Sequence, residues 1–441
     1  MRRAAMFAAF GLAGAGANAG NFDYQVTAGA AHSDNLTRVA TDEQDADIAS
    51  AGFKFSFDEQ TRKLTADLVG NFDYQKYLDD TYDDELIGSF VGDVTVAFVP
   101  ERFNWVFGDN FGQVLADPLL PSTPANSENI NYFTTGPDLS MAFGSKNRLR
   151  VGARYLRTDY EDSPYDSDGY LGEIGFGREL SSVNSLSLNG RFQQQTFDDT
   201  LLGADYDQSE AFVRYEGNGA RTQVKFDAGY TELDRDVQED SDSELLRLSV
   251  LRQLTRSSNL TLLGGREFAN TGAAFATFQG EGPITLDPNA GRQTPEPFLH
   301  DYVSLAWYFQ RNRTTFSLRA GIDEQDYEFA DALDQKLTNY GALFRRDLSA
   351  VSDIQLDAAQ IKGEFSLGGA EYTDTLAGLA FNWGVSRTLV LSLSYRYAHR
   401  AGDPLTGEYT ENRIWLSIGY RRGLPRNERL RPDFGADAPA N

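Results

Sequence analysis

The sequence predicts an all-β protein, a closed antiparallel transmembrane β-barrel of about twenty strands, and three observations lead to this prediction. Segments throughout the chain alternate apolar and polar side chains with a period of two residues. Their connections alternate between tight turns and longer, mostly acidic loops. After residue 20, no segment shows a convincing helical period, so we expect no helices that could cover the apolar faces of the strands. Such faces are best buried by lipid around a closed barrel.

The segment 385–420 shows the alternation most clearly. One face of its first strand is apolar or aromatic, with Leu389, Leu391, Leu393, Tyr395 and Tyr397. The other face carries Val390, Ser392, Ser394 and Arg396. A second strand repeats the pattern, with Ile414, Leu416, Ile418 and Tyr420 on its apolar face. One apolar and one polar face are typical of strands between lipid and a hydrated lumen.

About twenty such segments are predicted, and eighteen strands is the alternative because the first and sixth segments are the weakest. The segments are 22–32, 47–58, 61–76, 84–99, 102–113, 128–143, 147–160, 167–180, 184–198, 206–216, 221–234, 243–254, 258–270, 298–310, 313–327, 335–347, 352–364, 371–384, 387–400 and 409–421.

Every second connection between the predicted strands is a tight turn. They lie at 58–61, 99–102, 144–147, 180–183, 216–219, 254–257, 310–313, 348–351 and 384–387. Short periplasmic turns that alternate with longer external loops are typical of bacterial outer-membrane barrels. An even strand number would leave both ends of the barrel domain in the periplasm.

The N-terminus indicates export across the inner membrane. Arg2 and Arg3 precede a short apolar run, and Ala17-Asn-Ala19 has the small-x-small pattern of a cleavage site. Residues 1–19 are therefore predicted to be a signal peptide, residues 20–421 the barrel, and residues 422–441 a disordered, partly basic periplasmic tail. We expect the mature protein in the bacterial outer membrane, in contact with its lipid.

Composition narrows the possible functions. The chain has no Cys, which excludes disulfides and a lipid-attachment cysteine. A net charge of −25 argues against nucleic acid as a partner of the surface as a whole. Aromatic residues make up 12% of the chain although its mean hydropathy is −0.45, which suits strands with a single apolar face.

Strand parity predicts which charged side chains face the lumen. Candidate pore-lining residues are Arg150, Arg154, Arg191, Arg214, Lys225, Asp227, Arg247, Arg319, Asp357 and Arg396. The same parity turns Asp67, Asp93, Glu173 and Asp323 inward. A lumen with both signs favours either a hydrated, partly basic passage or internal salt bridges that stiffen the barrel.

Two long loops, 113–127 and 270–297, are candidates for a constriction. The first contains three prolines among leucines, and the second is rich in Gly and Pro. Loops of this length are uncommon unless they serve a function. Either of them could fold into the lumen and narrow it, or could remain a surface loop.

Catalytic and metal-binding patterns are weak. Acidic runs at 42–45, 79–85, 159–168, 198–199 and 234–244 crowd the predicted outer surface, but none has the spacing of a formed Ca²⁺ loop. The three histidines, His32, His300 and His399, each fall near the outer end of a predicted strand. An outer-rim hydrolase with a histidine base is therefore an alternative, although no motif places a Ser and a carboxylate beside any of them. We expect no enzyme activity, no cofactor and no metal.

The first hairpin carries a resemblance to a known family. Ser33-Asp34-Asn35 ends the first strand, and the following hairpin closes on Asp73-Tyr74. This pattern resembles the β-barrel porins of exopolysaccharide and PEP-CTERM (exosortase) gene systems over about the first eighty residues. The resemblance implies an outer-membrane barrel for polysaccharide export, with polysaccharide and periplasmic export components as partners.

The sequence thus favours a passive, hydrated passage, with export of an extracellular polysaccharide as the leading hypothesis. A general or substrate-selective diffusion porin and a structural barrel with a blocked lumen are the alternatives. The solute, the direction of transport and the oligomeric state are left open.

Overall fold

The computed structural model describes residues 20–199, 205–235, 239–279, 294, 296–327 and 330–423. The predicted signal peptide, most of the predicted tail and the central part of the 270–297 loop lie outside the described residues.

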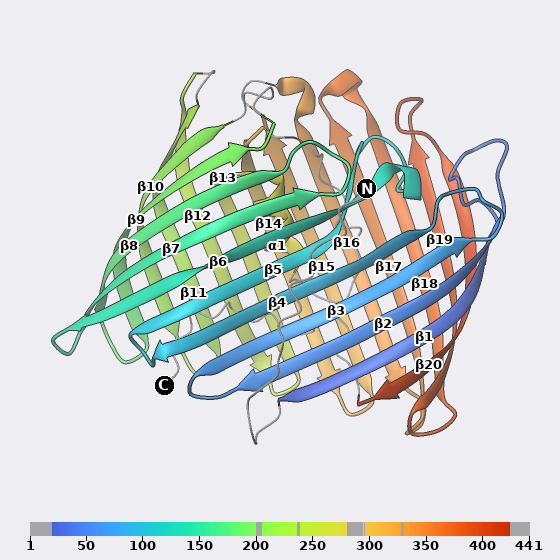
Figure 1. Ribbon diagram of the computed structural model, residues 1–441, viewed down its shortest axis with the longest axis horizontal. Coiled ribbons are helices and arrows are strands. Elements are labelled where there is room, and N and C mark those ends of the chain that lie inside the picture. Colours follow the sequence, from blue (N-terminus) through green and yellow to red (C-terminus); the bar gives the residue numbers. More distant parts are fainter. Residues whose placement is uncertain are drawn as a thin grey trace.

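Twenty antiparallel strands form a single sheet (Figure 1). They are β1 (Asn21–Ser33), β2 (Ala46–Gln60), β3 (Leu64–Tyr77), β4 (Glu85–Val99), β5 (Phe103–Leu115), β6 (Ser127–Phe143), β7 (Asn147–Tyr160), β8 (Ser167–Glu179), β9 (Asn184–Phe197), β10 (Tyr206–Asn218), β11 (Thr222–Arg235), β12 (Ser241–Thr255), β13 (Ser258–Ala269), β14 (Phe298–Arg311), β15 (Thr314–Asp326), β16 (Gln335–Asp347), β17 (Ser352–Phe365), β18 (Glu371–Gly384), β19 (Leu389–Gly402) and β20 (Tyr409–Arg422).

Each strand pairs with its neighbours in the sequence, and the first strand pairs with the last. The β1–β20 register runs from Tyr24 opposite Arg422 to Ser33 opposite Arg413, so the sheet closes without an edge. Closure satisfies the backbone groups that an open sheet would expose to lipid. The prediction of a closed barrel with about twenty strands is confirmed, and both weak segments are strands, β1 and β6.

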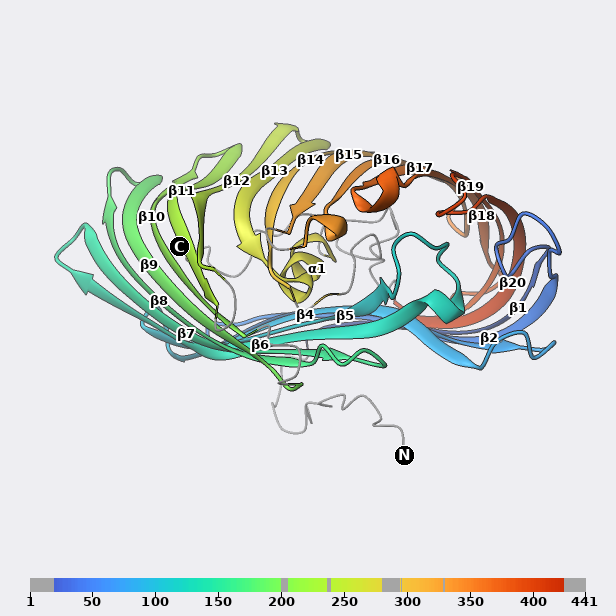
Figure 2. The ribbon, with the colours of Figure 1, turned by 90° about the horizontal axis from the view of Figure 1, so that it is seen from above.

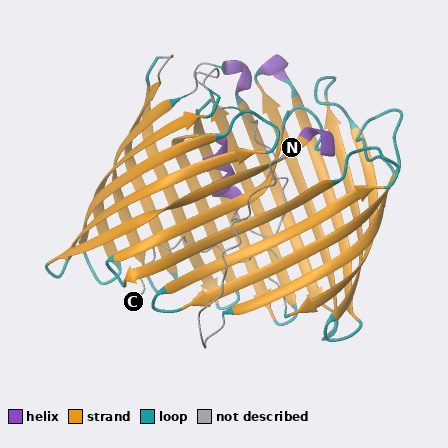
Figure 3. Cartoon of the chain, viewed as in Figure 1, coloured by secondary structure: helices purple, strands orange, loops and turns teal. Residues whose placement is uncertain are grey.

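Tight turns join the strands at one end of the barrel. Three of them use a residue with positive φ, namely Glu101 (66°), Gly144 (70°) and Asn312 (54°). A left-handed residue lets an antiparallel pair reverse within a few residues. The described parts of the longer loops lie at the opposite end, as the alternation in the sequence predicts (Figure 3).

The outer face of the barrel is apolar. Large apolar side chains are exposed on it, among them Leu188 (65% exposed), Leu416 (58%) and Ile174 (55%). Exposed tyrosines, including Tyr74 and Tyr170, lie near the loop ends of their strands. Exposed aromatic residues also lie near the turn ends of their strands, at Phe22, Phe98, Phe143, Trp383 and Tyr420. An apolar band between two aromatic girdles is the surface of a membrane-spanning barrel.

The inside of the barrel is occupied by loop segments. The α-helix α1 (Thr271–Gln279) follows β13 and lies within the lumen (Figure 2). Three short 3₁₀ turns in the described ranges lie in longer loops, at the end of the barrel opposite the tight turns: η1 (Pro124–Asn126), η3 (Asp331–Leu333) and η4 (Leu367–Gly369). Among the described helices, none has the length and apolar character required to cross a bilayer.

Candidate functional site

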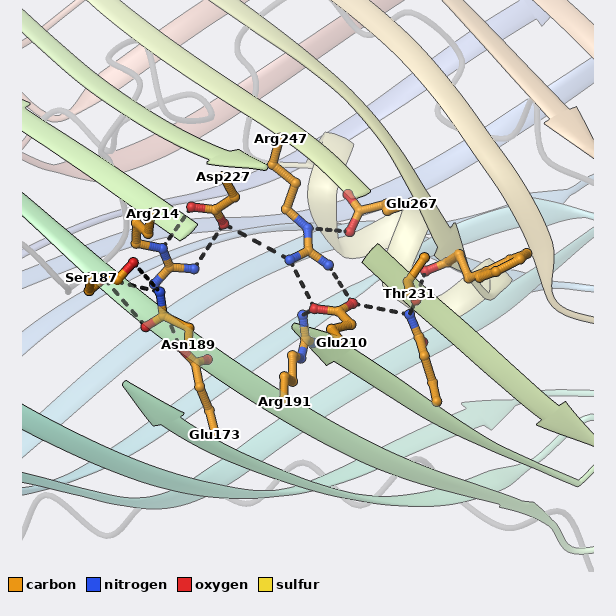
Figure 4. A network of polar contacts seen from close by, with 12 residues as sticks. Glu173, Ser187, Asn189, Arg191, Glu210, Arg214, Asp227, Thr231, Arg247 and Glu267 are labelled. Atoms are coloured by element: carbon orange, nitrogen blue, oxygen red, sulfur yellow. Dashed lines mark hydrogen bonds and ion pairs between the residues drawn. The ribbon is translucent and has the colours of Figure 1, made fainter. Parts of the chain in front are cut away.

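The inner face of β8–β13 carries a continuous set of ion pairs, drawn in Figure 4. We call it the ion-pair lattice, and its members are Glu173, Arg191, Glu210, Arg214, Asp227, Arg247 and Glu267. These residues come from strands 8, 9, 10, 11, 12 and 13, one after another around the wall. The lattice therefore cross-links six neighbouring strands through their side chains.

Glu210 and Arg247 are central to the lattice. Arg247 donates to both carboxylate oxygens of Glu210, at 2.7 and 3.1 Å, and its Nε donates to Glu267 at 2.6 Å. Arg191 reaches Glu210 at 3.7 Å from the opposite side. The Glu210 side chain is only 2% exposed, so its charge depends on these two arginines rather than on water.

Arg214 forms the second centre. It binds Asp227 through two parallel hydrogen bonds of 2.8 and 3.0 Å and lies 3.6 Å from Glu173. The guanidinium carbons of Arg214 and Arg247 lie 5.2 and 5.8 Å from the ring centre of Phe212. This buried ring contacts both arginines as a cation–π partner, and Asp227, 4.0 Å from Arg247, links the two centres.

The predicted pore-lining residues all lie on the inner face of the barrel. Each alternates with lipid-facing residues along its strand, many of them exposed and apolar, such as Val151, Phe192, Val213, Phe226, Leu246, Leu318, Leu356 and Tyr395. The structure brings Arg191, Arg214, Asp227 and Arg247 together in the lattice, whereas the others lie apart from it. Among these, Arg150 reaches Glu216 at 3.6 Å and Arg154 reaches Asp138 at 2.8 Å.

The remaining predicted residues are spread over other parts of the wall. Lys225 lies on β11 and Arg319 on β15, and both interact with other residues. The Asp357 carboxylate on β17 lies against Gly378 of β18, where a Cβ would come within 2.5 Å of it. Arg396 on β19 is exposed and forms no ion pair with the described residues.

Helix α1 crosses the lumen between opposite walls. Asn270 caps it, because the Asn270 side-chain oxygen accepts from the Ala273 backbone N–H at 2.8 Å. The same side chain donates to the Tyr206 hydroxyl of β10 at 2.9 Å. At Gly272, a Cβ would lie 2.8 Å from the Thr158 hydroxyl, so a glycine is needed for this close approach to β7.

Apolar contacts hold the helix at both sides. Phe275 packs with Val114 of β5 and Ile130 of β6. Ala274 packs with Phe298 of β14 and with Tyr327. The described part of the 270–297 loop therefore narrows the lumen, which is one of the two outcomes that the sequence left open.

A cavity of about 450 Å³ separates α1 from the ion-pair lattice. Among the helix residues whose side chains the structure describes, Ala273, Ala274 and Ala276 line it. The barrel wall contributes polar and aromatic groups: Tyr132, Arg191, Gln193, Tyr206, Gln208, Glu210, Arg247, Glu267, His300 and Tyr302. Its size lies within the range of about 300–1,000 Å³ that is typical of small-molecule sites.

The other long loop also folds inward. We call residues 116–126 the cap loop. Asn126 organises it from within, since its side chain accepts from the Asp117 N–H at 2.9 Å and donates to the carbonyl of Asp117 at 2.8 Å. Leu119 packs against a buried cluster on β16–β18 that includes Leu343 and Tyr372. The loop thus extends from β5 and β6 to the opposite wall.

Two arginines also hold the cap loop, Arg400 on β19 and Arg38 in the loop between β1 and β2. Arg400 is fully buried, binds Asp374 through hydrogen bonds of 2.7 and 2.6 Å, and donates to the carbonyl of Leu119 at 3.1 Å. Arg38 donates to the carbonyl of Ser122 and to Glu411. A paired guanidinium that still has spare N–H groups is well suited to hold backbone carbonyls of a loop.

The Ser33-Asp34-Asn35 element joins the first strand to the last. Ser33 donates to Glu411 at 2.6 Å, and Asp34 accepts from the backbone and side-chain nitrogens of Asn412 at 2.7 and 2.8 Å. Asn35 donates to the carbonyl of Thr410 at 3.0 Å. Three consecutive side chains therefore close the barrel at its loop end.

The three histidines lie in separate places. His32 contacts Asp47 at 2.9 Å, and His399 contacts Thr410 at 3.1 Å. Both histidines lie on the outer faces of their strands, because their neighbours in the sequence face inward. His300 faces the lumen, is buried, and bonds to Asp323. No group of three or more potential metal ligands is found in the described ranges.

The acidic outer loops are partly neutralised by arginine. Arg157 lies within 3.5 Å of Asp159, Asp166, Asp168 and Asp198, and so joins two of the predicted acidic runs. Burial of Asp166 between β7 and β8 raises the pKa of its carboxyl. This arrangement favours structural pairing over an open cation site.

Several central residues were missed by the sequence analysis. Glu210 has the same strand parity as Arg214, four residues on, and that signal was sufficient to place it in the lumen. Parity likewise puts Arg400 on the same face as Arg396. The contacts of Arg38 and Arg400 with the cap loop have no signal in the sequence, because they join segments far apart in the chain.

No protein-family model matches this chain, and neither does any curated protein sequence. Solved structures with a similar fold include the ferric enterobactin receptor PfeA of Pseudomonas aeruginosa, at 9% identity and a TM-score of 0.48 over 92% of this chain and 81% of that one. OccK2 (OpdF) of the same organism, in complex with glucuronate, matches at 12% identity and a TM-score of 0.37, over 91% and 98%. A loop-deletion mutant of OmpT of Vibrio cholerae matches at 11% and 0.33, over 92% and 100%.

This likeness is too distant for function to be transferred from those proteins to this chain. The fold rests on the strand pairing of this chain, and its function has to be inferred from its own lumen.

Proposed function

We propose that this protein is an outer-membrane channel that forms a passive, hydrated passage for hydrophilic solutes. The observation that supports this most directly is a closed barrel with an apolar outside and a polar inside, narrowed by two inward segments. An edge-free barrel with this surface is stable in a bilayer. Because α1 and the cap loop each reach an opposite wall, the passage is expected to select solutes by size and polarity.

Export of an extracellular polysaccharide is a finer proposal, supported by the resemblance of the first hairpin. The three residues that carry the resemblance form hydrogen bonds across the barrel closure, so they bear on assembly and not on the solute. The two crossing segments favour selective diffusion of small solutes over passage of a polymer. Dextrans of increasing size can be added during single-channel recording. A conductance that is reduced only by dextrans small enough to enter the lumen would support selective diffusion.

The experiment is single-channel recording of the refolded barrel in planar bilayers. The wild type is compared with Arg400→Ala, which removes the buried guanidinium that holds the carbonyl of Leu119. Loss of one partner of a buried pair costs about 3–5 kcal/mol, enough to release the cap loop. We therefore expect a stable conductance in the wild type and a larger, noisier one in Arg400→Ala.

Arg387→Ala is the matched control, since Arg387 is exposed in a tight turn at the other end of the barrel. It should conduct like the wild type. A barrel that is folded by heat-modifiable gel mobility but conducts in neither the wild-type nor the Arg400→Ala form would overturn the proposal and leave a structural barrel with a blocked lumen.

A further inference from the structure

We propose that the cavity between α1 and the ion-pair lattice is a binding site for a small, uncharged, polyhydroxylated solute of mono- or disaccharide size. The inference deepens the proposed function, because it names the solute class that such a passage would hold. It is carried by the charge balance, the hydrogen-bonding groups and the shape of the cavity.

The charges that line the cavity cancel. Its two arginines, Arg191 and Arg247, face its two glutamates, Glu210 and Glu267. A third pair, His300 with Asp323, lies beside them. An ionic solute would have to break an existing pair to gain a partner, whereas a hydroxyl can bond to the remaining N–H groups and lone pairs of paired groups. The cavity therefore disfavours ions and accepts neutral donors and acceptors.

The uncharged lining provides matching groups. The amides of Gln193 and Gln208 and the hydroxyl of Tyr302, which donates to Glu267 at 3.1 Å, are donors and acceptors close together. Tyrosine rings 132, 206 and 302 add flat apolar faces. A polyhydroxylated ring has hydroxyls around its edge and C–H groups on its faces, so both kinds of group on this wall find a counterpart.

The small side chains of α1 keep the cavity open. Ala273, Ala274 and Ala276 of the helix line the cavity of about 450 Å³, and a longer side chain at one of these positions would fill part of it. Ala276 belongs to neither of the two apolar clusters that hold the helix, which contain Ala274 and Phe275. This separation allows the cavity to be blocked without loosening α1.

The test measures binding of sucrose and of glucuronate to the full refolded barrel in detergent micelles by isothermal titration calorimetry. We expect saturable sucrose binding in the millimolar range and weaker binding of glucuronate. Ala276→Leu should abolish sucrose binding, and Tyr302→Phe should weaken it by about tenfold, the effect of one lost hydrogen bond.

A pair of charge variants sharpens the test. Glu267→Gln adds one net positive charge within the cavity and should shift the preference toward glucuronate. Glu173→Gln makes the same change elsewhere in the lattice, since Glu173 pairs with Arg214 outside the cavity lining, and should leave the preference unchanged.

Wild-type binding that favours glucuronate, or equal shifts in the two charge variants, would overturn the inference. So would sucrose binding that Ala276→Leu leaves intact. Because binding is measured without a bilayer, a conducting barrel that fails to bind sucrose refutes this inference alone, and a barrel that binds sucrose but never conducts refutes the proposed passage alone.

Discussion

Two walls of the same barrel are built in opposite ways. The wall of β8–β13 holds three arginines and four carboxylates in one lattice and lies behind α1. The wall of β18–β20, β1 and β2, which we call the small-polar wall, carries residues such as Thr27, Ser392 and Ser417. Its Arg396 is exposed, whereas Glu210 of the lattice is buried.

The difference separates two roles of lumen charge. In the lattice, the Glu210 and Asp227 carboxylates are desolvated and depend on their arginine partners, so a change there mainly affects stability. On the small-polar wall the loop end holds buried pairs such as Arg400 with Asp374, but Arg396 is exposed to solvent and acts on passing ions through its own field. The two alternatives for the lumen, stiffening salt bridges and a hydrated basic passage, therefore describe different parts of one barrel: buried pairs such as those of Glu210, and the exposed stretch of wall around Arg396.

The largest expected effect is the loss of Glu210. Glu210→Ala leaves Arg191 and Arg247 without their shared buried carboxylate, and should lower the free energy of unfolding by about 3–5 kcal/mol. Urea titration of the barrel in lipid vesicles, followed by tryptophan fluorescence, measures it. Ser392→Ala, which removes a 2.7 Å bond to Asn382 on the small-polar wall, should cost about 1 kcal/mol. Equal losses would contradict the contrast between the walls.

The next effect concerns ion selectivity. Arg396→Glu reverses an exposed charge on the small-polar wall, so the reversal potential in a KCl gradient should move toward cation preference. The free energy of unfolding should change by less than about 0.5 kcal/mol, as for other exposed substitutions. Arg396→Lys keeps the charge and should keep the selectivity. A large loss of stability with unchanged selectivity would place Arg396 in a structural role.

The smallest effect is a pH dependence at the loop end of the small-polar wall. Hydrogen bonds from the backbone N–H groups of Glu371 and Leu405 lower the pKa of Asp403. A carboxyl with a lowered folded-state pKa stabilises the fold above its unfolded pKa of about 3.9, and this contribution is lost as the pH falls through the folded value. Hydrogen-exchange protection of the Leu405 amide should therefore drop in acid. Asp403→Asn should show low protection already at neutral pH and little further change.

Much of the fold follows from local pattern. Period-two alternation gave the strands, and it also gave the inward direction of residues such as Arg247 and Asp357, because a strand side chain can face only two ways. The positions of the tight turns predicted which end of the barrel carries the turns and which carries the longer loops. The alternation rule would also have placed Glu210 in the lumen. Nothing in the spacing of Arg38 or Arg400 indicated a loop partner, since the hydrogen bond from Arg400 to the Leu119 carbonyl joins residues 281 positions apart.

The sequence by itself therefore determined the strands, the two faces of each strand and the presence of charges of both signs inside. Tertiary structure decided which charges meet, because the stagger between neighbouring strands sets the height of each side chain on the wall. It also decided that α1 and the cap loop cross the lumen, since each depends on contacts with a wall formed by distant strands. Local periodicity carries no information about such contacts until the barrel has closed.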